Sequence, residues 1–236
     1  MSLSSEPVLS KLQSQFVCGT KDIKNEPYCG VSGRHQPDSQ AIRTTNGAGP
    51  HNLQLFVLAP DGTVLHCLPG YWAPADLVRE LDLGQQLFSV WKNPALSRAQ
   101  KDQQFSQLQL AHASEHPPEM VMRSRMQGFD QKFEARRRAY QSDTVKDPEL
   151  AIKALQNDDP RLLKQAFKTT DQIVHERMAK RPFVAYEQFD VAVFSDYGRQ
   201  KYEKHEDQRD MLGRLPTKSG KKGITTLRRM KGNKNV

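Results

Sequence analysis

The sequence lacks any apolar run that approaches the roughly 18 residues needed to span a bilayer. Its first fifteen residues also lack the basic start and apolar stretch of a secretory signal peptide. These absences predict no membrane span and, for the chain as written, a cytoplasmic location. Localisation stays open, because a signal peptide in an upstream extension would direct the protein to the periplasm or outside the cell.

Cysteine is scarce, and the three thiols do not make a disulfide framework. Cys18 and Cys67 fall on predicted strands, where a buried structural thiol is expected. Cys29 lies in the polar loop Tyr28-Cys29-Gly30-Val31-Ser32 and is the candidate catalytic thiol, because Cys-x-x-Ser resembles a monothiol redox motif. Such reactivity requires a cation or a helix N-terminus that lowers the pKa of the thiol.

Motifs for other chemistry are missing or weak. The sequence has no Gly-x-Ser-x-Gly elbow and no glycine-rich phosphate loop before a helix. A zinc site made of Cys18, Cys29, His35 and His66 would lack the close pairs that organise structural zinc. His175 has no second histidine at metalloprotease spacing and is predicted to lie at the surface. We therefore expect neither a metal nor a cofactor.

Positive charge is concentrated at the C-terminal end. From residue 209 onward nine Lys or Arg residues face one acid, so the preceding residues are neutral overall. This segment has few large apolar residues, and we predict a disordered basic tail at 209–236. Its candidate anion-binding residues are Lys218, Lys221, Lys222, Arg228, Arg229 and Lys231. Without aromatic residues to stack on bases, it would bind nucleic acid or another anionic surface without sequence preference, or merely solubilise the chain.

Two apolar segments joined by a turn give the clearest local prediction, a β-hairpin at 53–58 and 64–68. Pro60-Asp61-Gly62 lies between them, and proline followed by glycine is typical of a tight turn. Before the hairpin, the patterns predict a helix at 5–13 and a short strand at 16–23. Residues 24–49 read mostly as loop.

After the hairpin, helices are predicted throughout. The first starts near Ala73 and has a break near Gly84. Proline in a first turn predicts four more, at 94–113, 118–141, 148–157 and 160–180. Arg136-Arg137-Arg138 is expected on a solvated helix face. The aromatic-rich segment 183–202 is expected to dock back on the rest of the protein.

The order of these elements resembles the thioredoxin family over about residues 6–90. Glu6–Leu12 looks like the helix after the family's redox motif, and residues 16–23 like the next strand. Gly49-Pro50 resembles the proline before the hairpin, and Pro69-Gly70-Tyr71 the glycine kink before the closing helix. The family's Cys-x-x-Cys would precede residue 6, and the chain has no such motif there.

The resemblance implies an α/β fold: an incomplete thioredoxin-like sheet with a hairpin and flanking helices at 1–92, a helical extension at 93–208, and the tail. It implies a protein-binding or scaffolding module without the dithiol, with Pro50, Tyr71 and Trp72 at the contact surface. The rival hypothesis is a thiol-disulfide oxidoreductase that uses upstream cysteines or Cys29 alone. The expected partner is a protein or a protein disulfide, and a homodimer would be one way to complete the sheet.

Overall fold

The computed structural model describes residues 2–26, 28–29, 44–47, 53–126, 131–157 and 159–194. Its helices are α1 (Glu6–Gln15), α2 (Pro74–Lys92), α3 (Arg98–Ser114), α4 (Pro118–Arg123), α5 (Gln131–Arg138), α6 (Pro148–Asn157), α7 (Pro160–Ala166) and α8 (Thr170–Ala179). Two strands, β1 (Gln54–Leu58) and β2 (Val64–Pro69), form an antiparallel sheet. Short 3-10 turns lie at Ser2–Ser4, Ser142–Thr144, Tyr186–Gln188 and Val191–Phe194.

The architecture is mostly helical around this small sheet, which is compatible with an α/β class. The predicted hairpin is confirmed, with Phe56 opposite Cys67 and a bulge between Val57 and Leu58. Gly62 has φ +84° in the connecting turn, as expected for glycine in that position. Every residue of β2 is buried, including Cys67, whose predicted burial is also confirmed.

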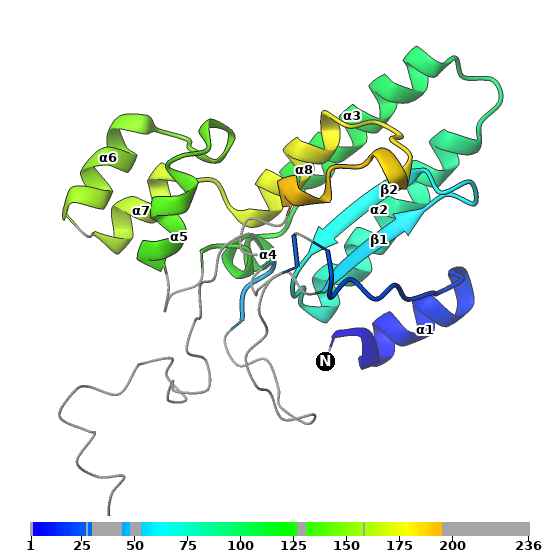
Figure 1. Cartoon of the computed structure of the whole chain (residues 1–236), viewed down its shortest axis with the longest axis horizontal. Helices are drawn as coiled ribbons and strands as arrows, with labels where there is room; N and C mark the ends of the chain where they lie inside the picture. Colours follow the sequence, from blue (N-terminus) through cyan, green and yellow to red (C-terminus); the bar gives the residue numbers. More distant parts are fainter. Residues whose placement is uncertain are drawn as a thin grey trace, which may run out of the picture.

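The main core joins the hairpin to helices from distant parts of the chain (Figure 1). The helix α2 packs on β2, and α3 lies between α2 and α8. Phe105 of α3 and Met178 of α8 belong to the same buried cluster as Leu65 of β2. Residues on both sides of position 92 therefore share one core.

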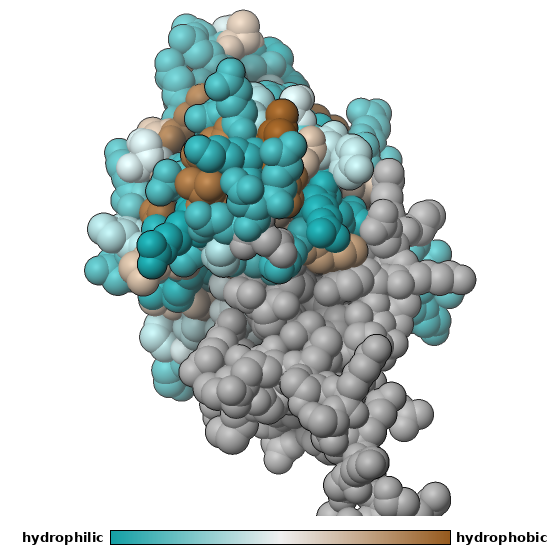
Figure 2. All heavy atoms as spheres, turned by 90° about the vertical axis from the view of Figure 1, so that its left-hand side faces the viewer, coloured by the Kyte–Doolittle hydropathy of each residue, from teal (hydrophilic) through white to brown (hydrophobic). Residues whose placement is uncertain are grey.

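A second, smaller apolar cluster is formed by α5, α6 and α7. Arg138 connects α5 to the start of α8: its guanidinium donates to Glu134 Oε1 at 2.8 Å and to Thr170 Oγ1 at 2.9 Å. The predicted solvated face is therefore wrong for Arg138, because its side chain is buried between two helices. Arg136 is exposed, as predicted. Viewed from the side of these helices, hydrophilic residues predominate, with apolar ones between them (Figure 2).

Several predicted elements differ from the structure. Residues 16–23 form no strand, and Val17 and Cys18 are exposed, so the expected burial of Cys18 is also wrong. The predicted helix at 118–141 is replaced by two shorter ones, α4 and α5. The predicted helix at 160–180 ends at Ala166, and α8 begins separately, where Thr169 and Gln172 form a capping box.

The helix predicted at 94–113 starts later than predicted, since α3 begins at Arg98 after a capping box of Ser97 and Gln100. Other helix predictions are confirmed. The helix α6 has the predicted bounds, and Phe183, Phe189 and Phe194 are buried in the main core, as expected of a docking segment. Tyr197, Tyr202 and the basic tail lie outside the described residues. Among the helices that are described, none is both long and apolar enough to cross a membrane.

The predicted break at Gly84 is wrong, because α2 continues through it. A Cβ at Gly84 would lie 2.9 Å from Val57 Cγ1, so the missing side chain lets the helix approach β1 closely. We expect Gly84→Ala to destabilise the protein by about 1 kcal/mol, since overpacking outweighs the gain in helix propensity. In a Val57→Ala background the same substitution should be stabilising. Thermal unfolding of the native protein, the two single variants and the double variant tests this. A change in stability of the same sign in both backgrounds would contradict it.

Candidate metal centre

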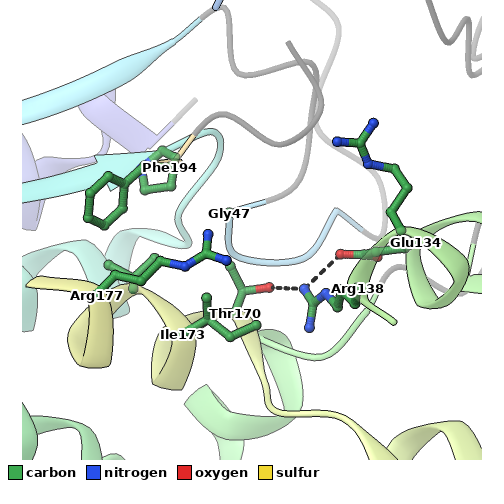
Figure 3. Close-up of a pocket in the computed structure, with 10 residues that line it drawn as sticks. Gly47, Glu134, Arg138, Thr170, Ile173, Arg177 and Phe194 are labelled. Atoms are coloured by element: carbon green, nitrogen blue, oxygen red, sulfur yellow. Dashed lines mark hydrogen bonds and ion pairs between the residues drawn. The ribbon is translucent and has the colours of Figure 1, made fainter. Parts of the chain in front are cut away.

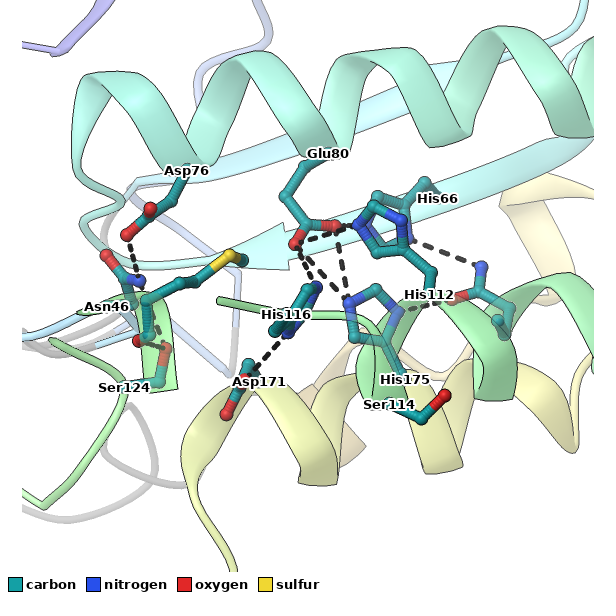
Figure 4. A network of polar contacts seen from close by, with 12 residues as sticks. Asn46, His66, Asp76, Glu80, His112, Ser114, His116, Ser124, Asp171 and His175 are labelled. Carbon is teal, nitrogen blue, oxygen red and sulfur yellow. Dashed lines mark hydrogen bonds and ion pairs between the residues drawn. The ribbon is translucent and has the colours of Figure 1, made fainter. Parts of the chain in front are cut away.

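Three helices of the main core each direct polar side chains toward one point beneath the hairpin (Figure 4). Glu80 comes from α2, His112 from the last turn of α3, His116 from the connection between α3 and α4, and His175 from α8. His116 follows the end of α3 by two residues, and its ring lies edge-on to that of His112, with the ring centroids 4.7 Å apart. Each of the four offers one ligand atom, and these atoms all lie within 4.8 Å of one another.

The centre of this group is a single carboxylate oxygen. Oε1 of Glu80 is 3.4 Å from Nε2 of His175, and 3.5 Å from Nε2 of both His112 and His116. Nε2 of His112 and of His116 is buried without a hydrogen-bond partner. Buried polar atoms normally have a partner, so nitrogens that face a shared space without one indicate a missing ligand.

The group is almost completely shielded from water. The side chains of Glu80 and His175 are 0% exposed and that of His116 is 2% exposed, whereas that of His112 reaches 17%. Burial lowers the pKa of His175 to about 4, so its imidazole is neutral at pH 7. Neutral imidazole is the form that binds metal ions.

Glu80 remains ionised in this setting. Burial alone would raise the pKa of its carboxyl, but its contacts with His175 and His66 hold that pKa well below its usual range. A second carboxylate, Asp171 of α8, is also fully buried and lies 2.8 Å from His116 Nδ1. Buried charges require compensation, and a divalent cation would neutralise these two.

The ligand nitrogens are oriented by partners on their other side. His116 Nδ1 contacts Asp171 Oδ2 at 2.8 Å, and His175 Nδ1 contacts Gln109 Oε1 at 2.7 Å. Both oxygens accept, so both Nδ1 atoms carry the proton and both Nε2 atoms present a lone pair. Carboxylates and carbonyls that hold the far nitrogen of a histidine are typical of metal sites.

A neighbouring polar network on α2 has a different character. Asp76, one turn before Glu80, pairs with Arg123, and Asn46 donates to the same carboxylate at 2.8 Å. The charge of Asp76 is thus balanced by a cation, and its contacts join the start of α2 to α4. We interpret this network as structural.

A pocket lies on another side of α8 and is bordered by α5 and Phe194 (Figure 3). Arg138 and Arg177 line it, and both are engaged in the protein: Arg138 with Glu134 and Thr170, and Arg177 with Asp143 Oδ2 at 2.8 Å. These contacts hold the helices together, so the histidine cluster remains the better functional candidate.

The residues predicted from the sequence do not converge on this centre. Cys29 is half-buried, and its backbone N–H donates to Glu26 O at 3.0 Å. Tyr71 is half-buried, while Trp72 is buried and its Nε1 donates to Pro69 O at 3.0 Å. Pro50 and the six tail cations lie outside the described residues. The roles assigned to these residues therefore stay predictions.

The sequence reasoning missed the centre and misplaced one of its members. His175 was expected at the surface and is fully buried, since it lies on the face of α8 that packs against α3. Of the weakly supported zinc set, Cys18 is exposed, His35 lies outside the described residues, and His66 alone adjoins the centre. The available signal was the pair His112 and His116, at helical spacing near the end of a predicted helix.

Comparison with known proteins returned no match: no family model, curated protein or solved structure is detectably similar to this chain. The functional interpretation therefore depends on the geometry of the site.

Proposed function

We propose that this protein binds one divalent transition-metal ion through Glu80, His112, His116 and His175. The observation that carries the proposal is the position of Glu80 Oε1, 3.4–3.5 Å from three imidazole nitrogens inside the core. Imidazole-rich sets favour zinc, iron, nickel and copper, whereas calcium and magnesium favour sets made only of oxygen.

The ion would mainly stabilise the folded state. Its ligands come from α2, from the end of α3 and the residues after it, and from α8, which lies far from the other two in sequence. Binding would hold these helices together at one point. Four protein donors leave little room for substrate, and closed sites of this kind contribute folding energy. A metal-stabilised core is therefore a better interpretation than a hydrolytic centre.

The test measures the metal content of the purified full-length chain by plasma mass spectrometry after dialysis against trace zinc. We expect about one equivalent per chain, and its loss in the double variant His112→Gln/His175→Gln. Asp76→Asn is the control, because it also perturbs a buried charge on α2 but touches none of the four ligands. Native protein that retains no transition metal would refute the proposal.

A second candidate function is the thioredoxin-like protein-binding module suggested by the sequence. In its favour, α1, the hairpin and α2 follow in the expected order, and Gly70 has φ +68° at the expected kink. Under this hypothesis Tyr71 lies at the partner surface. If Cys29 instead acts as a monothiol, the chain supplied with glutathione should catalyse reduction of a protein disulfide such as insulin's. The Cys29 thiolate would form a mixed disulfide with one sulfur while the other leaves as a thiolate, and glutathione would then release Cys29. Cys29→Ser but not Cys18→Ser should abolish that activity.

A further inference from the structure

The second oxygen of Glu80 has a separate role from the first. Oε2 is 2.8 Å from Nε2 of His66 on β2, and both side chains are 0% exposed. Both oxygens are 3.4 Å from Nε2 of His175, whereas the contacts with His112 and His116 are made by Oε1. An ionised carboxylate only accepts, so His66 Nε2 must carry the proton. In a neutral imidazole the other nitrogen, Nδ1, is then a lone pair that requires a donor.

Gln109 of α3 supplies that donor. Its Nε2 lies 3.4 Å from His66 Nδ1, and its Oε1 lies 2.7 Å from His175 Nδ1. One orientation of the amide thus donates to His66 and accepts from His175. The reverse orientation would face each imidazole with the wrong group, and would turn a proton of His175 toward Glu80 instead of a lone pair.

The distances around Oε1 also distinguish between coordination geometries. Ligand atoms about 2.1 Å from a tetrahedral ion lie about 3.4 Å apart, whereas adjacent ligands of an octahedral ion lie about 3.0 Å apart. The three Oε1–Nε2 distances are 3.4, 3.5 and 3.5 Å, close to the tetrahedral value.

Building on the proposed function, we infer that the ion is zinc, bound in a four-coordinate site of three nitrogens and one oxygen. Glu80 binds through Oε1, because this oxygen lies near all three imidazole nitrogens while Oε2 makes its shortest contact with His66. His66 and Gln109 are positioning residues: they do not touch the ion, but they fix which oxygen of Glu80 and which nitrogen of His175 face it.

The experiment compares His66→Leu with His66→Gln in the full-length chain. Zinc affinity is measured by competition with a chromophoric chelator, and coordination by the visible absorption of the cobalt(II)-loaded protein. Loss of an outer partner typically weakens metal binding about 10- to 100-fold, which we expect for His66→Leu, together with a changed cobalt spectrum. His66→Gln should retain affinity within about threefold, because its amide can still donate to Glu80.

A second pair of variants covers the case in which His66→Leu does not fold. Gln109→Met removes the amide from the centre at similar size, and Gln107→Met makes the same change on the exposed side of α3. We expect weaker zinc binding in Gln109→Met and native zinc affinity in Gln107→Met.

These experiments distinguish failure of the proposed metal binding from failure of the assigned coordination. If the native chain binds neither zinc nor cobalt, the proposed function itself falls. If it binds them, but His66→Leu and Gln109→Met match the native affinity, or cobalt shows the weak absorption of a six-coordinate ion, only the assignment of coordination and positioning residues falls.

Discussion

Glu80→Gln should weaken zinc binding by about two to four orders of magnitude. The substitution replaces the only anionic ligand with a neutral amide, while Asp171 and three imidazoles stay buried around the ion. Removing one partner from a buried charged pair typically costs 3–5 kcal/mol, and each 1.4 kcal/mol is a factor of ten in affinity. The fold should persist, because the amide oxygen can still accept the hydrogen bond from His66.

The measurement is a competition titration of the native and variant chains with a chelator of known affinity. Glu115→Gln is the matched control: it makes the same chemical change on an exposed side chain next to His116. Its affinity should equal that of the native protein. If Glu80→Gln also stays within threefold of native, Glu80 is not a ligand.

Removal of the ion should lower the thermal stability of the protein substantially. A ligand that binds only the folded state stabilises it by about 4 kcal/mol at a free concentration one thousand times its Kd. For a chain of this size that corresponds to a decrease in Tm of about 8–16 °C. The ion joins α2, α3 and α8, so the loss should be concentrated there.

Thermal unfolding with and without a strong chelator checks the size of the effect, and amide hydrogen exchange checks its location. Protection should fall in α8 and at the end of α3, and should change less in α6, which lies in the second cluster. Restoring zinc should restore both properties. An unchanged Tm in excess chelator would contradict a stabilising ion.

The sequence predicted elements that depend on neighbouring residues. The hairpin follows from two apolar runs around Pro60-Asp61-Gly62, and the start of α6 follows from proline in its first turn. The same reasoning placed a strand at 16–23, because Val17 and Cys18 resemble strand residues. A strand also needs a partner for its backbone, and among the described residues none pairs with this segment.

The candidate centre was less accessible to such reasoning. His112 and His116 were recognisable as a pair only by their closeness in sequence, because α3 ends between them. His175 gave no such signal, since histidine at a helix surface and histidine in a core look alike in sequence. Glu80 was hidden for a similar reason: an isolated acid in a helix is normally solvated, and its burial depends on what packs against it.

The sequence by itself therefore determined the local elements: the hairpin turn, the proline starts of α2, α4, α6 and α7, and a concentration of basic charge after residue 208. Only the tertiary structure decided that Glu80 meets His175, 95 positions away, and that Gln109 joins His175 to His66. The physical reason is that turns and caps depend on contacts within a few residues. A buried centre instead depends on which helix faces the core packing brings together.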